Sequence, residues 1–132
     1  MGQSILVTGS SSGLGRRISE TLARHGHTVY AGMRNTRGKN ADVATTFSAW
    51  AQEANLTLQV LDMDVTDDAS VQQAVQHVVD QSGRIDVVVN NAGVMVVGLS
   101  EACTVDQLRQ MYEVNLFGVY SAKIPSGGCY LT

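Results

Sequence analysis

The sequence predicts an α/β fold in which helices cover both faces of a doubly wound parallel sheet. Short apolar runs alternate with segments whose apolar residues recur every three or four positions, the pattern of strands alternating with helices. The run at residues 85–89 is apolar almost throughout, as a strand buried on both faces requires. Crossovers between parallel strands are right-handed. We therefore expect about four strands in the order 3-2-1-4, truncated relative to a sheet with two βαβαβ halves.

The strands and the first two helices follow from this periodicity. Between the first two strands, Leu14, Ile18 and Leu22 are four residues apart and share one face of a helix that ends at Gly26. Apolar residues at helical spacing predict a second helix over about residues 43–54. Apolar runs predict strands at residues 4–8, 28–33, 56–63 and 85–89.

Capping signals locate the two later helices. Thr66 or Asp67 can cap a third helix, which ends near Gly83. Thr104 with Gln107 three residues later forms a capping box that opens a fourth. The strand–helix alternation stops there, after four pairs.

The chain is long enough for one domain and apolar enough for a core. It has 132 residues, of which 44% are hydrophobic and 16% charged. We place the domain at residues 1–122. Pro125 should end the fourth helix, so we expect an irregular tail at 123–132.

Composition also bears on location. No run approaches the ~20 apolar residues of a membrane span, and no basic stretch precedes a long apolar one as in a signal peptide. Cys103 and Cys129 form no Cys-x-x-Cys pair, which favours free thiols in a reducing compartment. These observations predict a cytoplasmic protein without a membrane partner.

Charge is unevenly distributed along the chain. Residues 1–39 carry six basic side chains and one acidic side chain, whereas the whole chain has a net charge of −3. A basic first third indicates a local anionic ligand, although for Arg16, Arg17 and Arg24 we favour the alternative of a solvated helix face. The positive charge is too sparse for a nucleic-acid partner.

Histidines and aromatic residues indicate no further site. His25, His27 and His77 lack Cys or carboxylate partners at ligand spacing, so we expect no metal. Phe47 and Trp50 lie at helical spacing and are more typical of a core than of a stacking platform.

A glycine-rich turn joins the first strand to the first helix. Gly9, Gly13 and Gly15 follow the spacing G-x-x-x-G-x-G, which is neither G-x-G-x-x-G nor a P-loop. Such a turn brings a diphosphate to the free N–H groups of a helix start, and the Ser11 and Ser12 hydroxyls can donate to it. The alternative is an ordinary strand–helix loop.

The end of the second strand bears on the choice of dinucleotide. Met33 and Arg34 stand where an acid would bind the ribose 2′-hydroxyl of NAD, and no acid follows until Asp42. An Arg there accommodates a 2′-phosphate, which favours NADP over NAD, and Arg37 and Lys39 could assist. The alternative is a solvated turn of mixed charge.

Four motifs in order resemble the N-terminal part of the short-chain dehydrogenase/reductase family, over about residues 3–120. They are Thr8-Gly9-x-x-x-Gly13-x-Gly15, Asp64-Val65-Thr66, Asn90-Asn91-Ala92-Gly93 and Asn115 in Val-Asn-Leu-Phe-Gly. The resemblance implies a Rossmann-type fold, a nicotinamide cofactor, and oxidation of alcohols or reduction of carbonyls. It makes Asn115 the Asn of a catalytic tetrad. The cofactor-binding residues it implies, together with Arg34, are Gly9, Ser11, Ser12, Gly13, Leu14, Gly15, Asp64, Val65, Asn90, Asn91, Ala92 and Gly93.

The residues themselves agree with these roles in part. Asp64 follows the carboxyl end of a strand, where it can accept from an adenine amino group or supply charge to a helix start. The small residues Ala92 and Gly93 would let the backbone approach a ribose. Asn115 is in register with the apolar face of the fourth helix, so its amide needs a partner, which we expect to be backbone.

The chain departs from the family at the catalytic Tyr, the Lys four residues later and the Ser. Tyr120 and Lys123 are three residues apart and continue the helix of Asn115, so we do not expect a catalytic pair. Two hypotheses remain: an NADP-dependent oxidoreductase represented by its cofactor-binding half, or a non-catalytic binding or interaction module. A carbonyl or alcohol substrate is expected only if the catalytic half is supplied.

We also expect self-association. The fourth strand would have an unpaired apolar edge, and the fourth helix would present uncovered apolar side chains: Leu108, Met111, Leu116 and Phe117.

Overall fold

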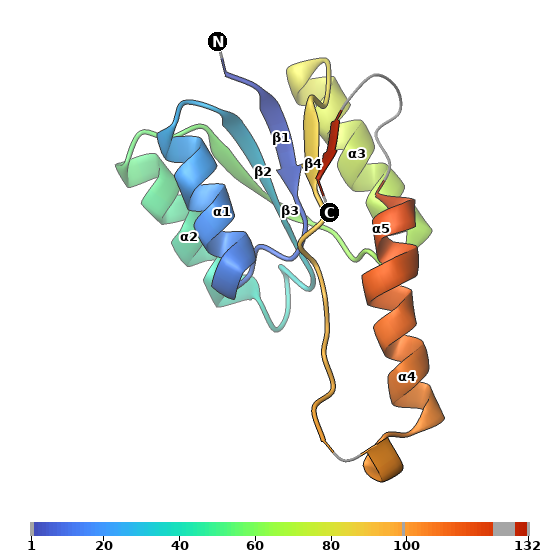
Figure 1. Cartoon of the computed structure of the whole chain (residues 1–132). Helices are drawn as coiled ribbons and strands as arrows, with labels where there is room; N and C mark the ends of the chain where they lie inside the picture. The colour runs from blue at the N-terminus through green and yellow to red at the C-terminus, as the bar shows by residue number, and fades with distance from the viewer. Residues whose placement is uncertain (1, 99, 123–128, 132) are drawn as a thin grey trace.

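The computed structural model describes residues 2–98, 100–122 and 129–131 (Figure 1). In chain order the elements are β1 (Ser4–Val7), α1 (Gly13–Arg24), β2 (Thr28–Met33), α2 (Ala41–Glu53), β3 (Leu58–Asp62), α3 (Asp68–Ser82), β4 (Val87–Val89), the 3₁₀-helix η1 (Ser100–Ala102), α4 (Val105–Tyr112), the π-helix η2 (Glu113–Phe117), α5 (Gly118–Ser121) and β5 (Cys129–Leu131).

The strands form one sheet in the order β3-β2-β1-β4-β5, and every neighbouring pair is parallel. The predicted order 3-2-1-4 is therefore confirmed. Each of these strands is connected to the next one in the chain by a segment that contains a helix, α1, α2 or α3, as parallel pairing requires. The strand order reverses between β1 and β4, because β2 and β3 follow on one side of β1 and β4 lies on the other.

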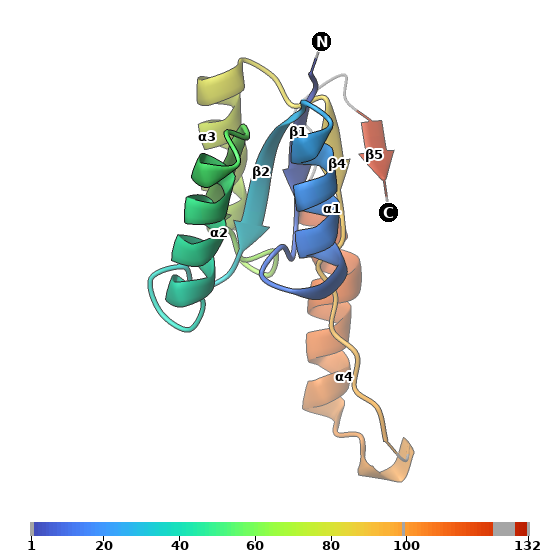
Figure 2. The ribbon, with the colours of Figure 1, turned by 90° about the vertical axis from the view of Figure 1, so that its left-hand side faces the viewer.

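The strand β5 corrects two expectations. Within the tail 123–132 that we expected to be irregular, residues 129–131 pair with β4 in register, Val87 opposite Cys129 and Val89 opposite Leu131. The β4 edge is thus not unpaired (Figure 2). Pairing uses backbone groups that every non-proline residue carries, so it needs little side-chain signal. Residues 123–128 and 132, and with them Lys123 and Pro125, lie outside the described residues.

Two layers of helix cover the sheet, α1 and α2 on one face and α3 with α5 on the other (Figure 1). Alternate residues of the strands face each layer, because successive side chains of a strand point in opposite directions. In β1, Ile5 and Val7 pack with Ala23 of α1, whereas Leu6 packs with α3 and with Val114 of η2. The alternation explains why the central strands read as continuous apolar runs.

The helix boundaries follow the predicted caps. Asp67, not Thr66, caps α3, and its carboxylate accepts from the N–H groups of Ala69 and Ser70 at 3.0 and 3.3 Å. Thr104 and Gln107 form the predicted capping box of α4.

The α1–α2 layer contains both a correction and a confirmation. Leu14 was expected on the inner face of α1, but it is 68% exposed because it lies in the first turn, beyond the edge of the core. Phe47 is fully buried, as predicted. Arg16 stacks on the Phe47 ring at 4.8 Å and Arg24 on the Trp50 ring at 5.4 Å. These two guanidinium groups therefore cover α2 and are not simply solvated.

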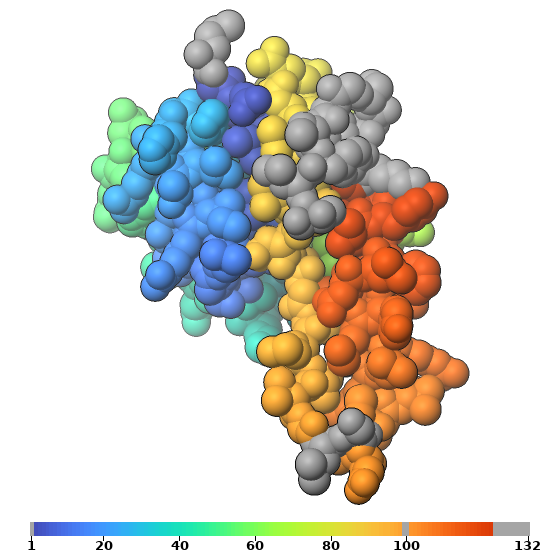
Figure 3. Space-filling model, in the orientation of Figure 1, coloured from blue at the N-terminus to red at the C-terminus, as the bar shows by residue number. Residues whose placement is uncertain are grey.

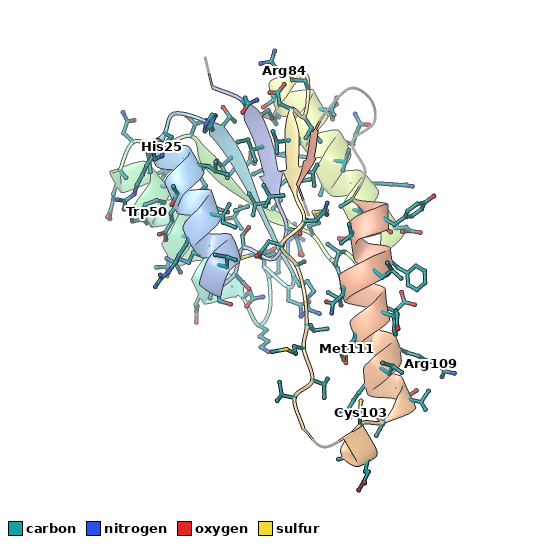
Figure 4. All side chains as sticks on the ribbon, in the orientation of Figure 1. His25, Trp50, Arg84, Cys103, Arg109 and Met111 are labelled. Carbon is teal, nitrogen blue, oxygen red and sulfur yellow. The ribbon has the colours of Figure 1, made fainter. Side chains whose placement is uncertain are left out.

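The α4–η2–α5 helix extends beyond the body of the sheet, and residues 92–98 run beside it (Figure 3). Met111 lies on the side of α4 that faces this extended segment, whereas Arg109 points away from it (Figure 4). Within the part of the chain that the structure describes, no helix is long and apolar enough to cross a membrane.

Candidate functional site

A cavity of about 390 Å³ opens at the carboxyl ends of β1, β2, β3 and β4. In parallel α/β sheets, ligands bind at this edge, beside the point where the strand order reverses. The lining residues come from four strand–helix connections and from η2: Gly9, Ser11, Ser12, Met33, Arg34, Asn40, Met63, Asp64, Val65, Asn91, Ala92, Gly93, Val94 and Val114.

Hydrogen bonds between Thr8 and Asn91 hold two sides of this cavity together. The Asn91 side-chain amide donates to the carbonyl oxygens of Thr8 and Gly9, both at 3.1 Å. In the opposite direction, the Thr8 hydroxyl oxygen accepts from the backbone N–H groups of Asn91 at 3.1 Å and Ala92 at 2.9 Å. The turn after β1 is therefore fixed to the segment after β4 before any ligand binds.

Side chains larger than hydrogen do not fit in this turn. Gly9 has φ +67°, and a Cβ there would lie 2.7 Å from the Ala92 Cα. A Cβ at Gly15 would overlap the Gly9 carbonyl oxygen and the Asn91 amide. Gly13 has φ +56°, which side-chain-bearing residues rarely adopt. The glycines thus let α1 begin directly against the cavity.

The start of α1 is suited to an anion. The Ser12 N-cap makes no side-chain cap hydrogen bond, and the first turn holds no acidic residue. Ser11 and Ser12 both line the cavity. Free N–H groups at a helix N-terminus, with the helix dipole behind them, favour phosphate groups.

Arg34 directly follows β2 and is one of the residues that line the cavity. Among the described residues, the ion pairs involve other arginines, so the Arg34 guanidinium has no acidic partner. The backbone here is shaped by Asn35 at φ +54° and by the Asn40 side-chain amide, which donates to the Arg34 carbonyl at 2.6 Å. Arg37 and Lys39 do not line the cavity.

Asp64 and Val65 form the cavity wall after β3. The Asp64 Oδ1 accepts from the Thr66 N–H at 2.9 Å and from the Thr66 hydroxyl at 2.6 Å, which leaves Oδ2 without a protein donor in the described structure. Because Asp67 caps α3, the Asp64 carboxylate is not engaged as the helix cap. Val65 is 6% exposed and faces the cavity with an apolar side chain.

Asn115 lies within η2, where the helix widens to a π-turn. Its side-chain amide forms a two-point hydrogen bond with one residue: Oδ1 accepts from the Val94 N–H and Nδ2 donates to the Val94 carbonyl, both at 2.8 Å. This is the backbone partner that the sequence pattern required. It attaches the segment after β4 to the helix.

A second cavity of about 460 Å³ lies beside the first, bounded by Asn90, Ala92, Gly93, Val94, Met95, Asn115 and Val119. The Asn90 side-chain nitrogen is buried and has no hydrogen-bond partner among the described residues. A buried donor without an acceptor is uncommon, which marks this amide as available to an acceptor that is not part of the described chain.

The structure therefore gathers most of the expected cofactor residues around the first cavity and separates a few. Leu14, Gly13 and Gly15 shape the start of α1 without lining it, and Asn90 borders the second cavity. The remaining wall residues are Met33, which the sequence pattern placed only at a strand end, and Asn40, Met63, Val94 and Val114, which it did not single out. For Met33 and Met63 a signal existed, because each ends or follows a predicted strand at the binding edge.

Other candidates lie elsewhere. Tyr120 is exposed on α5, and Lys123 lies outside the described residues. No group of three or more His, Cys, Asp or Glu side chains that could hold a metal occurs in the described ranges. Asp86 lies at the opposite end of the sheet, where a hydrogen bond from the Ser4 N–H lowers the pKa of its carboxyl group, with help from Arg84.

Comparisons with known proteins agree with this geometry. The family model for short chain dehydrogenases matches residues 3–123. A 3-ketodihydrosphingosine reductase of Bacteroides thetaiotaomicron is 34% identical over 117 residues, covering 89% of this chain and 38% of that protein. A mutant short-chain dehydrogenase/reductase of Serratia marcescens superposes with TM-score 0.82 and 33% identity, over 92% of this chain and 48% of that one.

A third relative was solved with a dinucleotide. A blue fluorescent protein from a metagenomic library, in complex with NADPH, superposes with TM-score 0.83 and 28% identity, over 98% of this chain and 54% of that one. This chain thus spans 38% to 54% of the length of these three proteins. With a family match over nearly its whole length, the chain belongs to the short-chain dehydrogenase family.

Proposed function

We propose that this chain is an NADP(H)-binding part of a short-chain oxidoreductase that transfers hydride between NADP and a small alcohol or carbonyl compound. The observation that carries the proposal is the preformed cradle: a glycine turn closed against Asn91, an uncapped helix start and an unpaired Arg34 guanidinium on one cavity. A dinucleotide has the diphosphate and 2′-phosphate charges that these groups suit.

The residues present fit such a cofactor. Ser11, Ser12 and the first N–H groups of α1 would hold the diphosphate, because nothing in the described structure occupies them. Asp64 and Val65 would hold the adenine ring between a carboxylate acceptor and an apolar wall. Asn91 keeps the turn closed from the other side. When bound, a nicotinamide dinucleotide supplies or accepts the hydride.

The preference for NADP over NAD rests on Arg34. Its guanidinium lies at the strand end where NAD-binding folds have an acid, and it has no ion-pair partner within the described ranges. The similar blue fluorescent protein was solved with NADPH. Arg37 and Lys39 add positive charge to the same loop.

A specific observation favours a second function, a non-catalytic binding or interaction module. The 132 residues contain no Tyr followed four positions later by Lys. Asn115, the tetrad residue that is present, uses both polar atoms of its side chain in hydrogen bonds to the Val94 backbone. We therefore propose that this chain alone binds the dinucleotide without turnover, and that a substrate enters only with the catalytic half.

Self-association and a cytoplasmic location complete the proposal. A stripe of large apolar side chains on the α4–η2–α5 helix is 47% to 69% exposed: Val105, Leu108, Tyr112, Leu116, Phe117 and Tyr120. Exposed apolar patches of this kind mark contact surfaces, and a second copy of the chain offers the same stripe. Cys103 is an exposed free thiol, as suits a reducing compartment.

Calorimetric titration with NADPH and NADH tests the cofactor. We expect NADPH to bind more tightly, and Arg34→Ala to weaken NADPH by roughly 10- to 100-fold, since a charge-assisted hydrogen bond contributes about 1.5–3 kcal/mol. NADH affinity should change little. Arg17→Ala removes the same charge from the exposed face of α1 and should leave both affinities unchanged. Equal affinity of the unmodified chain for the two cofactors contradicts the 2′-phosphate assignment.

An activity assay separates the two functions. We expect no NADPH oxidation above the no-enzyme rate with a panel of ketones, aldehydes and quinones, because a positioned general acid alone contributes about 10²–10⁴ in rate. The sample must be shown by mass spectrometry to end at Thr132, since a trace of host reductase would mimic activity. Steady turnover that Tyr120→Phe abolishes would establish catalysis by this chain.

A further inference from the structure

On the helix that carries Asn115, Gly118 lies directly against Val65 of the cavity wall. This residue is buried, and a Cβ built on it would lie 2.7 Å from the Val65 Cγ2 and 3.0 Å from the Val65 Cβ. Real Cβ atoms essentially never show a contact under 3.0 Å. A hydrogen atom at position 118 is therefore what lets the helix lie directly against Val65.

Val65 connects this contact to the cavity. It faces the 390 Å³ cavity on one side and the Gly118 backbone on the other. Val114, one turn before Gly118 on the same helix, lines the cavity as well and is 5% exposed. Two apolar side chains of one wall, from segments about fifty residues apart, thus have their spacing set by the approach at Gly118.

A hydrogen bond fixes the same two segments a turn further along. The Ser121 hydroxyl donates to the Asp68 Oδ1 at 2.9 Å. Asp68 is the first residue of α3, three positions after Val65. The helix is therefore attached to the β3–α3 connection both through an apolar contact and through a polar one.

From these contacts we propose that Gly118 is a positioning residue for dinucleotide binding: it acts through Val65 to set the wall that receives the adenosine part. The inference rests on the proposed cofactor function. We assign the adenosine part to this wall because Val65 lines the same cavity as Arg34 and Asp64, whereas Asn90 and Asn115 line the second cavity. The role differs from helix stability, because Ala is the better helix former and would favour the helix if the space were open.

The binding test uses the whole chain and adenosine 2′,5′-bisphosphate as the probe, titrated by calorimetry. Gly118→Ala should weaken this probe by roughly tenfold, within the range that contacting residues show in coupled variants. Gly98→Ala is the matched control, because a Cβ there meets nothing within 4 Å and the residue does not line either cavity. Its affinity should equal that of the unmodified chain.

A double-mutant cycle tests whether the effect of Gly118→Ala on binding passes through Val65. Val65→Ala removes the Cγ2 atom that would lie 2.7 Å from the new Cβ and leaves only the Val65 Cβ at 3.0 Å, so Gly118→Ala should weaken the probe less in that background than in the unmodified chain. An effect of Gly118→Ala that does not pass through Val65 would lower the affinity by the same factor in both backgrounds. Ser121→Ala, which adds no bulk, gives a second measurement if Gly118→Ala does not fold, and it should weaken the probe by roughly threefold.

The outcomes are distinct. If the unmodified chain binds neither the probe nor NADPH, the proposed cofactor function fails and the positioning role falls with it. If the unmodified chain binds and Gly118→Ala binds equally well, the positioning role alone is overturned. Equal losses in the two Val65 backgrounds also overturn it, while leaving the cofactor function in place.

Discussion

The α1–α2 layer and the α4–η2–α5 helix treat the same kind of side chain in opposite ways. Phe47 of α2 is fully buried between the sheet and the Arg16 guanidinium. Phe117 of η2, in a helix of similar apolar content, is 53% exposed. The dinucleotide cradle is thus built on a region that is closed by its own residues, whereas the helix that bears Asn115 keeps an apolar face open.

This contrast separates the residues that shape the cavity from Asn115, which depends on the other region. The glycine turn and Arg34 adjoin the closed region, whose core lies on the α1–α2 face of the sheet. Asn115 depends on the open helix and on one two-point hydrogen bond. We expect mutations in the two regions to differ in size and in kind.

The largest effect is expected for Phe47→Ala. Removing a fully buried phenyl group should lower the free energy of unfolding by about 3–5 kcal/mol, because the cavity left behind adds to the lost burial. The Arg16 guanidinium also loses the ring on which it stacks. Urea denaturation followed by circular dichroism measures this loss. A change below about 1 kcal/mol would show that the α1–α2 layer is not the closed core described here.

Much of this closed region can be predicted from the sequence for a physical reason. Strands buried on both faces must be apolar, so β1, β2 and β4 stand out as continuous apolar runs, and their order follows from right-handed crossovers. Leu14 was placed wrongly because helical spacing states which residues share a face but not how far the core extends under it. Residues 129–131 were missed because strand pairing depends on backbone groups.

The candidate site could be predicted from the sequence where chemistry restricts the residue type. Gly9 and Gly13 adopt positive φ and Arg34 carries a charge, so each stands out in a single sequence. The bracing role of Asn91 depends on contact with residues more than 80 positions away, which no local pattern contains. Val114 lines the cavity through the packing of η2, and nothing in its neighbours distinguishes it from a core valine.

An intermediate effect is expected for Asn115→Ala. The substitution removes two hydrogen bonds at 2.8 Å to Val94. Because each contributes about 0.5–1.5 kcal/mol and both are exposed, the free energy of unfolding should fall by about 1 kcal/mol, the lower end for two bonds. The Val94 N–H then loses its acceptor, so its amide hydrogen should exchange faster. Hydrogen exchange read by NMR measures this directly.

The control for Asn115→Ala is Gln110→Ala, which changes an exposed amide of the same helix whose side chain has no hydrogen bond in the described structure. It should leave Val94 exchange unchanged. Equal exchange at Val94 in Asn115→Ala and in the unmodified chain would mean that the two-point contact does not hold the segment after β4.

The smallest effect on stability is expected for Phe117→Ala, the open counterpart of Phe47→Ala. Because about half of the Phe117 side chain is already in contact with water, the free energy of unfolding should change by no more than about 0.5 kcal/mol.

Self-association should respond instead, since aromatic side chains carry a large share of interface energy. Sedimentation velocity at about 100 μM, a concentration at which dimers with micromolar dissociation constants form, should show the unmodified chain associating and the variant shifted toward monomer. Leu116→Ala, 54% exposed beside it, should shift the distribution in the same direction. A monomeric unmodified chain would remove the second copy as the partner of this face. A loss of stability as large as that of Phe47→Ala would show that the helix face is part of the core, and the contrast between the two regions would then disappear.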